Sequence, residues 1–490
     1  MADVERMSRV DTAWLRMDNE VNLMMIVGVW LLTPAISMHA LRQRLADKLL
    51  QFERFRQRAI ADAMGAHWVF DDRFDIGNHV VAAQLKPAPG QTERQALQRL
   101  CGELAATPLH PTRALWQFHL IEDYEGGSAL IARIHHCIGD GMALTSVMMS
   151  ITDGGADPPR RKPPAAPERT PDHDWVSDAV VKPLTELAVK AMALFGDGMA
   201  RRGDRLPTMQ QTKQTTQTKQ TQQPLQGGVD RARSGLRVLN DMAALALMPD
   251  DSPTLLKGQP DGKKVVAWSE PLSLEDVKSV GTGLGCTVND VLLSCAAGAI
   301  GSYLLAQGQD PAGKEIRAMV PVNLRPLENA WQLGNRFGLA PLVLPIGVAN
   351  PVQRVHAVRR RMDELKGSYQ PLLAFAVLSL SGLFNKPMQD AVLGLFARKA
   401  TAVMTNVPGP AGPLKFCGST LRQNMFWVPA SGNIGVGVSI LSYAGGVQFG
   451  LITDHKLCPE PQQIIDRFEP EFDKLLWLAM MLPWAGQDLD

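Results

Sequence analysis

The apolar positions of the first 150 residues follow strand and helix spacings in turn. Short apolar runs bounded by turn residues are typical of strands, whereas apolar residues three and four positions apart are typical of helices. We predict, in order, a strand over residues 24–32, a helix capped by Ser37, a helix opened by the capping box at Thr92, and a strand over 128–134. Residues 1–152 are therefore expected to form a mixed α/β domain.

The last part of the chain, residues 263–490, returns to the same alternation. Two apolar runs separated by Ala444-Gly445-Gly446 predict a hairpin, because glycine-rich turns of this length join antiparallel strands. The predicted elements are a helix capped by Thr287, a strand over 316–322, helices within 372–400, a strand over 402–407 and hairpin strands over 434–443 and 447–453. They indicate a second α/β domain.

Between the two predicted domains, residues 153–262 have a different composition. An amphipathic helix interrupted by Pro183 is expected over 174–199. The run MQQTKQTTQTKQTQQ at 209–223 has almost no apolar side chains, so ordering it costs conformational entropy without burying apolar surface. We expect a linker that contains helices and a disordered stretch over about residues 209–228.

Composition and charge narrow the class of protein. Hydrophobic residues make up 45% of the chain and charged residues 20%, which suits two packed cores. The net charge of +1 argues against a nucleic-acid-binding protein that depends on phosphate neutralisation. The longest apolar runs are shorter than the roughly 20 residues that span a bilayer, and the N-terminus shows no signal-peptide pattern. The six cysteines show no CxxC pair and no metal-ligand spacing, so we expect a cytoplasmic protein without a metal site.

The most informative stretch is HHCIGDG at residues 135–141. It follows directly on the predicted strand 128–134, in which successive side chains point to opposite faces. His136 then shares a face with Leu130, Ala132 and Ile134, and His135 lies on the other face. The two glycines after the histidines allow a sharp turn into a helix. The pattern therefore predicts two histidines in different environments at a strand-to-helix turn.

A histidine in this position suits general acid–base chemistry. A neutral imidazole, with an ordinary pKa of about 6.5, can take the proton of an attacking hydroxyl group and return it to a leaving thiolate. Asp140 can orient the imidazole or brace the turn through an ion pair. A structural histidine pair and a weak metal site stay open as alternatives, although no third ligand stands at a recognisable spacing.

HHxxxDG is the signature of the CoA-dependent acyltransferase superfamily, and further segments narrow the resemblance. In order along the chain they resemble the characteristic blocks of bacterial wax ester synthases/diacylglycerol acyltransferases. The resemblance covers nearly the whole chain outside the predicted linker. The blocks are MSRVDTAW at 7–14, ALW at 114–116, TVNDVLL at 287–293, VPVNLR at 320–325, GN at 334–335, TNVPGP at 405–410 and the segment 432–454.

The resemblance implies an α/β fold of two chloramphenicol-acetyltransferase-like domains with a tunnel at their interface. It implies an O-acyltransferase that moves a long-chain fatty acyl group from acyl-CoA to a fatty alcohol, giving a wax ester, or to diacylglycerol, giving triacylglycerol. Acyl-CoA is then a substrate, and no cofactor is expected. The enzyme is expected in the cytoplasm, with peripheral contact to the inner membrane or to lipid droplets.

The resemblance also assigns roles to individual residues. His136 is the general base of a mechanism without a covalent intermediate, His135 supports it, and Asp140 is mainly structural. Gly141 completes the motif and, with Asn289 and Asp290, is expected to bind substrate or support the active site, Asn289 by positioning the acceptor or the oxyanion. The pair Asn289 and Asp290 matches the family's ND pair beside the active site and lies in the first turn of a predicted helix, where free N–H groups favour developing negative charge. Ordinary helix capping is the alternative explanation for this pair.

Two segments depart from the family pattern, and two other functions stay open. The family's PLW block reads Ala114-Leu115-Trp116, and its N-P-M-H block reads Asn22-Leu23-Met24-Met25, which affects the expected substrate preference more than catalysis. The alternatives are a condensation-type or polyketide-associated acyltransferase, and a catalytically silent, lipid-droplet-associated lipid-binding protein.

Overall fold

The computed structural model describes residues 4–62, 65–156, 248–325, 332–366, 368, 370–382 and 386–481. Residues 1–159 and 248–490 form one compact unit, to which all of the following applies. The helix predicted over 174–199 and the low-complexity stretch over 209–228 lie outside the described residues.

The N-terminal part supplies most of one six-stranded sheet. In spatial order its strands are β13-β14-β2-β7-β6-β5, antiparallel except for the parallel pair β5 and β6. A separate three-stranded sheet has the order β1-β4-β3. The N-terminal strands are β1 (Val4–Arg6), β2 (Met25–Thr33), β3 (Gln57–Asp62), β4 (Gly65–Phe70), β5 (Val80–Ala82), β6 (Trp116–Tyr124) and β7 (Gly127–His135).

The C-terminal part forms a seven-stranded mixed sheet. Its order is β11-β10-β12-β15-β16-β8, and β9 also pairs with β16. Strands β15 and β16 form the predicted hairpin, in which Ala444 and Gly445 have φ values of 48° and 82°. The strands from this part are β8 (Lys264–Trp268), β9 (Leu272–Ser273), β10 (Ile316–Asn323), β11 (Phe337–Leu344), β12 (Ala402–Pro408), β13 (Lys415–Phe416), β14 (Ser419–Trp427), β15 (Val436–Tyr443) and β16 (Gly446–Asp454).

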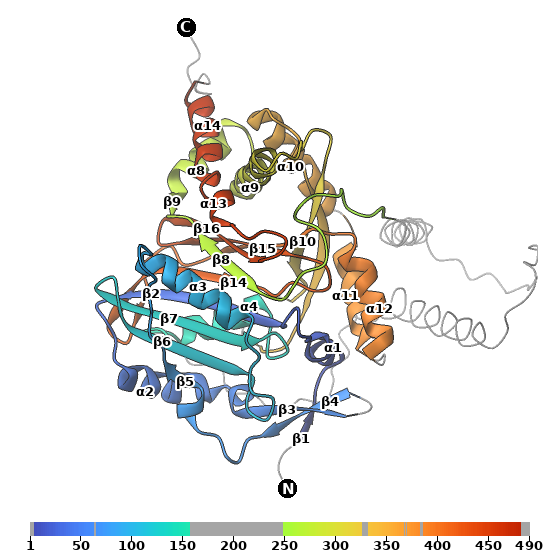
Figure 1. Ribbon diagram of the computed structural model, residues 1–490. Helices are drawn as coiled ribbons and strands as arrows, with labels where there is room; N and C mark the ends of the chain where they lie inside the picture. The colour runs from blue at the N-terminus through green and yellow to red at the C-terminus, as the bar shows by residue number, and fades with distance from the viewer. Residues whose placement is uncertain are drawn as a thin grey trace, which may run out of the picture. The chain divides into compact units, whose positions relative to one another are not determined.

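Strands β13 and β14 come from the C-terminal part of the sequence but belong to the N-terminal sheet. β14 pairs antiparallel with β2, so that Trp427 lies opposite Val27 and Asn424 lies opposite Trp30. In Figure 1 the orange β14 lies beside the blue β2. The two predicted domains are thus joined by shared sheet structure, which the order of elements along the chain did not predict.

Helices cover both sheets and follow the predicted caps. Ser37, Thr92 and Thr287 each accept the expected backbone hydrogen bond at a helix start, and Thr92 and Thr287 form capping boxes. The helices are α1 (Arg9–Met17), α2 (Met38–Lys48), α3 (Glu93–Ala105), α4 (Gly141–Ser150), α8 (Leu274–Gly283), α9 (Val288–Ala306), α10 (Pro351–Lys366), α11 (Gln370–Ser381), α12 (Lys386–Ala397), α13 (Gln462–Ile465) and α14 (Phe468–Met481); short 3₁₀ helices lie at Leu49–Gln51, Glu53–Arg56 and Ile76–Asn78.

The two faces of the N-terminal sheet belong to different cores. On one face, Leu130, Ala132 and Ile134 of β7 pack in a cluster with Leu45 of α2 and Leu144 of α4. On the other face, residues of β2 and β7 pack with α3 and with β8 of the C-terminal part. Strand alternation therefore assigns the side chains of β7 to two separate layers, as the sequence predicted.

Helix α9 is the central helix of the C-terminal core. It is apolar on all sides, and most of its residues are buried. Among the described residues it is the one helix long and apolar enough to cross a bilayer, but 78% of its most apolar window is buried inside the fold. Its composition is that of a core helix of a packed domain.

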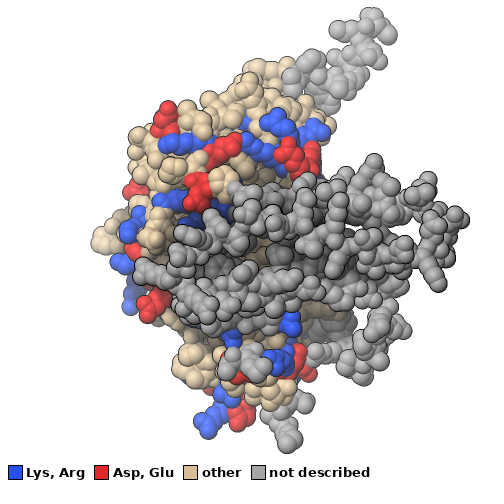
Figure 2. All heavy atoms as spheres, turned by 90° about the vertical axis from the view of Figure 1, so that its right-hand side faces the viewer, with Lys and Arg blue, Asp and Glu red and all other residues tan. Residues whose placement is uncertain are grey.

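The described part of the surface carries charges of both signs. In Figure 2, Lys and Arg side chains alternate with Asp and Glu side chains over the visible described face. This mixture agrees with the net charge of +1 and offers no single-sign field on that face for a nucleic acid.

Candidate active site

The two histidines of the motif are fixed through their main chains. The His136 N–H donates to the Met24 carbonyl at 2.7 Å, and the His135 N–H donates to the Leu115 carbonyl at 2.9 Å. Met24 and Leu115 lie in the two segments that depart from the family pattern. Since these segments hold the histidines by backbone carbonyls, which every residue type provides, the departures leave this support intact.

The His136 ring is buried between aromatic side chains. It stacks on Trp14, with ring centroids 4.1 Å apart and planes at 13°, and its centroid lies 5.5 Å from that of Phe337. Its Nδ1 atom is buried and has no hydrogen-bond partner among the described residues. Burial lowers the pKa of His136 to about 4, an effect that the nearby Asp140 carboxylate opposes. The imidazole is therefore neutral at pH 7 and able to accept a proton.

His135 lies in a different environment, as strand alternation predicted. Its Nδ1 accepts the Cys137 N–H at 3.1 Å, so in the neutral ring the proton is on Nε2. That nitrogen lies 3.8 Å from Oδ1 of Asp18. His135 is thus held within the turn that presents His136, which suits a supporting role.

Asp140 braces the turn and does not orient the His136 ring by any described hydrogen bond. It is the N-cap of α4, where Oδ1 accepts the Ala143 N–H at 2.9 Å. Its Oδ2 accepts a hydrogen bond from Arg325 at 3.1 Å and from the Arg336 N–H at 3.0 Å. Of the two roles proposed from the sequence, the geometry matches the ion pair.

A second buried network holds the backbone at His136. Nδ2 of Asn335 donates to the His136 carbonyl and to Oδ1 of Asp11, both at 2.7 Å. Asp11 also accepts the Asn335 N–H at 3.0 Å. Burial raises the pKa of the Asp11 carboxyl above its ordinary value, whereas the hydrogen bonds from Asn335 lower it. The network ties α1 to the strand end that carries the histidine.

Sequence reasoning assigned no role to four residues that surround the motif: Asp11, Trp14, Arg325 and Asn335. Each lies inside one of the family-like blocks at 7–14, 320–325 and 334–335. The signal was therefore present, but the sequence does not show that these blocks, far apart along the chain, meet at the histidine turn.

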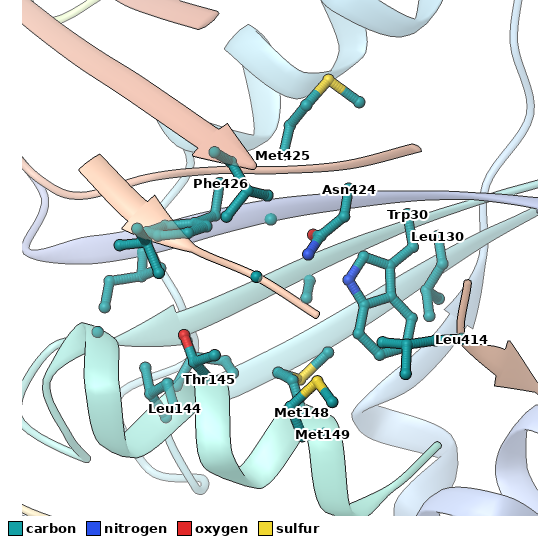
Figure 3. A pocket seen from close by; sticks show the side chains of 18 of the residues that line it. Trp30, Leu130, Leu144, Thr145, Met148, Met149, Leu414, Asn424, Met425 and Phe426 are labelled. Carbon is teal, nitrogen blue, oxygen red and sulfur yellow. The ribbon is translucent and has the colours of Figure 1, made fainter. Parts of the chain in front are cut away.

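An apolar pocket adjoins the motif. It encloses about 810 Å³ of space not filled by atoms, including its open side, and both the N-terminal and the C-terminal part contribute residues to its lining. Gly141, the last residue of the motif, lines it, and no atom lies within 4 Å of the place where a Cβ would stand. Figure 3 shows Thr145, Met148 and Met149 on α4 facing Trp30 and Asn424 across this space. A hydrocarbon chain fits the character of these walls.

Asn289 and Asp290 lie in the first turn of α9, as predicted. Asp290 forms the capping box with Thr287, and its Oδ1 is buried without a partner among the described residues. Oδ1 of Asn289 accepts a hydrogen bond of 2.6 Å from Asn406, whose neighbour Val407 lines the pocket. None of the described hydrogen bonds joins this pair to His136. Capping therefore accounts for Asp290, and contact of Asn289 with a substrate stays a prediction.

Metal binding finds no support in the described ranges. Within them, no group of three or more His, Cys, Asp or Glu side chains is arranged to hold a metal ion. The adjacent histidines themselves point to opposite faces of the strand end, so they do not converge on one ion.

The Asp140–Arg325 pair predicts a large stability effect. Both side chains are almost fully buried, with exposures of 6% and 2%. Arg325→Gln leaves the Asp140 carboxylate buried without its cation, so we expect a loss of about 3–5 kcal/mol in the free energy of unfolding. Denaturant unfolding followed by circular dichroism measures this.

Arg422→Gln is the matched control, because Arg422 pairs with Glu125 at 4.0 Å on the exposed surface. That change should cost less than about 1 kcal/mol. Equal losses in the two variants would show that the buried pair does not hold the motif in place.

The comparison with family models covers both parts of the chain. The wax ester synthase/diacylglycerol acyltransferase catalytic domain matches residues 7–292, and the WS/DGAT C-terminal domain matches residues 333–476. A probable diacylglycerol O-acyltransferase of Mycobacterium tuberculosis, tgs1, is 26% identical over 455 residues, which cover 91% of this chain and 89% of the relative. A second one from that organism, tgs2, is 25% identical over 417 residues, covering 83% of each chain.

Solved structures share the fold. The wax ester synthase/diacylglycerol acyltransferase from Marinobacter aquaeolei superposes with a TM-score of 0.62 at 20% identity, covering 97% of this chain and 100% of that one. The first condensation domain of the calcium-dependent antibiotic synthetase gives a TM-score of 0.55 at 14% identity, covering 98% and 97%. The predicted two-domain α/β fold is thus confirmed. Because the family models match most of the chain, and the motif residues lie together in the folded structure, this chain belongs to the wax ester synthase/diacylglycerol acyltransferase family and is an acyltransferase.

Proposed function

We propose that the enzyme transfers a long-chain fatty acyl group from acyl-CoA to the hydroxyl group of a fatty alcohol or a diacylglycerol, with His136 as general base. The observation that carries this proposal is the position of His136. Its ring is neutral, buried and held at the end of a strand whose preceding same-face residues, Ala132 and Ile134, line an apolar pocket. The names of the mycobacterial relatives support diacylglycerol as one acceptor.

The proposed reaction proceeds in one transfer without an acyl-enzyme. His136 accepts the hydroxyl proton as the acceptor oxygen attacks the thioester carbonyl, and a tetrahedral oxyanion forms. The C–S bond then breaks, and the protonated imidazole returns its proton to the leaving thiolate, which gives CoA and the ester. The thioester is already an activated donor, so this proposal includes no cofactor.

The remaining motif residues hold the base in place. His135 and Asp140 fix the turn through the Cys137 N–H and through Arg325, and neither needs to touch a substrate. Gly141 leaves the pocket wall open beside the turn. Asn289 is proposed to position the acceptor or the oxyanion. With its Oδ1 bonded to Asn406, its Nδ2 group is the available donor.

Product analysis tests this function. The purified protein is offered palmitoyl-CoA, or a palmitoyl thioester of a carrier protein, with hexadecanol, dipalmitoylglycerol or glycerol, and thiol release and ester products are measured. We expect wax ester, triacylglycerol or both, each with stoichiometric CoA. Binding of the lipids without CoA release would favour a silent lipid-binding protein. Transfer only from a carrier-protein thioester would favour a condensation-type enzyme.

We also propose that the enzyme is cytoplasmic and meets its water-insoluble acceptors at a lipid surface. Helix α14 packs into the core through Phe472 and Leu475, whereas Trp477 and Met480 are 61% and 65% exposed. Exposed tryptophan beside apolar residues suits a membrane interface. Trp484 and the other residues after 481 lie outside the described residues.

Liposome flotation measures this contact. The parent protein is expected to float with phosphatidylcholine vesicles, and the double change Trp477→Ser and Met480→Ser should reduce the floating fraction several-fold. Leu305→Ser, at a residue that is 61% exposed at the end of α9, is the matched control. Equal flotation of all three proteins would exclude α14 as the contact.

A further inference from the structure

One wall of the pocket is a strip formed by three adjacent strands, β14, β2 and β7, whose opposed residues are in register. Side chains of directly opposed residues in an antiparallel sheet share a face. One row across the strip consists of Asn424, Trp30 and Leu130, and the next consists of Phe426, Gly28 and Ala132. All six residues line the pocket. The row after these, Ile26 with Ile134, leads to His136, whose N–H is bonded to Met24.

The strip has the length of a long hydrocarbon chain. From Ile134 back to Leu130, both of which line the pocket, is four residues of extended strand, or about 13 Å at roughly 3.3 Å per residue. One leaflet of a bilayer, half of a hydrocarbon core about 30 Å thick, is of similar length. Helix α4 covers the strip from Gly141 beside the motif to Met149 at the far end. The pocket therefore extends along β7 away from the motif turn, of which Gly141 lines it.

In the middle row, which consists of Phe426, Gly28 and Ala132, the two residues of β2 and β7 have almost no side chain. Gly28 lies inside β2, where glycine lowers strand stability, and Ala132 lies opposite it. A Cβ on Gly28 would meet its nearest atoms at 3.6 to 4.0 Å, which is ordinary contact. The backbone therefore tolerates a side chain here, and the bare position is not explained by packing of the protein itself. Any atom beyond the Cβ would enter the pocket.

We infer that this pocket binds a long hydrocarbon chain of a substrate, and that Gly28 determines how long a chain it admits. The chain extends from the ester-forming end near His136, over Gly28 and Ala132, to the row of Trp30, Leu130 and Asn424. This inference rests on the proposed function. Both the acyl group of the donor and the tail of the acceptor are long hydrocarbon chains. The test therefore has one arm for the donor chain and one for the acceptor chain.

The test is the Gly28→Val variant of the full-length protein. In the donor arm, kcat/KM is measured for palmitoyl- and octanoyl-CoA with hexadecanol; in the acceptor arm, hexadecanol and octanol are compared with palmitoyl-CoA. In one arm the long-to-short ratio should fall at least about tenfold, because several methylene groups lose their burial. The other arm should not change, and this identifies the chain that the pocket holds.

Matched variants separate chain length from general damage. Gly28→Ala adds one methyl group in ordinary contact and should change the same ratio by less than about fourfold. Gly412→Val adds the same bulk at an exposed position with open space around it and should leave the ratios unchanged. Ala132→Val fills the same row from β7 and is used if Gly28→Val fails to fold.

Thermal unfolding shows which variants are folded. If the folded Gly28→Val and Ala132→Val variants keep the parent's long-to-short ratios in both arms, the assignment of the chain to this pocket is wrong while the acyltransferase function stands. If the parent transfers no acyl group from any donor, the proposed function itself fails.

Discussion

His136→Ala is expected to lower kcat/KM for acyl transfer by roughly 100- to 10,000-fold, the range typical for loss of a general base. Nδ1 of the ring has no hydrogen-bond partner among the described residues, and the variant keeps the main-chain carbonyl that accepts the Asn335 hydrogen bond. The variant should therefore fold. Release of CoA, followed with a thiol reagent, measures the effect.

His135→Ala is the control within the motif. It removes the acceptor of the Cys137 N–H, so the turn loosens while the base remains, and the loss of activity should be milder. Thermal unfolding of both variants checks that they are folded. A His136→Ala protein as active as the parent would eliminate His136 as the base.

The pH profile gives a second test of the same residue. Burial holds the pKa of His136 at about 4, below its ordinary value of 6.5, because the charged form is disfavoured inside the protein. The base is then protonated only near pH 4. Because the pH dependence of kcat/KM reports the titration of groups in the free enzyme, kcat/KM should not decrease around pH 6.5 as it would with an exposed histidine as base. An acid limb centred on pH 6.5 would show that the working base is a solvated group.

The same shift affects stability with a definite sign. The unfolded chain binds a proton at His136 near pH 6.5, whereas the folded protein binds it only near pH 4. The contribution to stability is therefore fully present above about pH 6.5 and is lost as the pH falls towards 4. Burial also lowers the pKa of His79, and that of His119 to about 4, so comparison of the parent with the His136→Ala variant isolates the contribution of His136.

The second large effect concerns the length of the acyl chain on the CoA donor. Palmitoyl-CoA carries roughly 14 more methylene groups than acetyl-CoA, and each contributes about 0.8 kcal/mol when buried, an upper bound near 11 kcal/mol before ordering costs. Even a fraction of this free energy corresponds to a difference of several powers of ten in kcat/KM. A long-chain donor should therefore greatly outperform acetyl-CoA, since the pocket beside the motif is lined mainly by apolar side chains.

A competition experiment with equal acetyl-, octanoyl- and palmitoyl-CoA measures this preference from the ester products of one acceptor. Octanoyl-CoA should fall between the other two, because the gain grows with each buried methylene group. Preference for acetyl-CoA would mean that the pocket does not hold the acyl chain, and would favour an enzyme of small-ester synthesis.

The sequence by itself determined the local structure and the family. The apolar run predicted the strand that ends at His135. Because successive side chains of a strand point to opposite faces, the sequence separated the two histidines before any contact was known. The caps Ser37, Thr92 and Thr287 were predicted from three or four adjacent residues, because capping is a local hydrogen bond. The family followed from the order of short motifs along the chain.

Only the tertiary structure decided how these pieces form a site. Asp140 forms an ion pair with Arg325, which is 185 residues away in the sequence. Asn335 bonds to both His136 and Asp11, and Asp11 is 324 residues from Asn335. Strands β13 and β14 join the N-terminal sheet although β12 and β15, the strands before and after them in sequence, belong to the C-terminal one. A carboxylate can cap a helix, pair with an arginine or do both, and a strand can pair with any exposed edge in register. The choice depends on which distant backbone and which buried charge the fold brings alongside, and local periodicity carries no information about that.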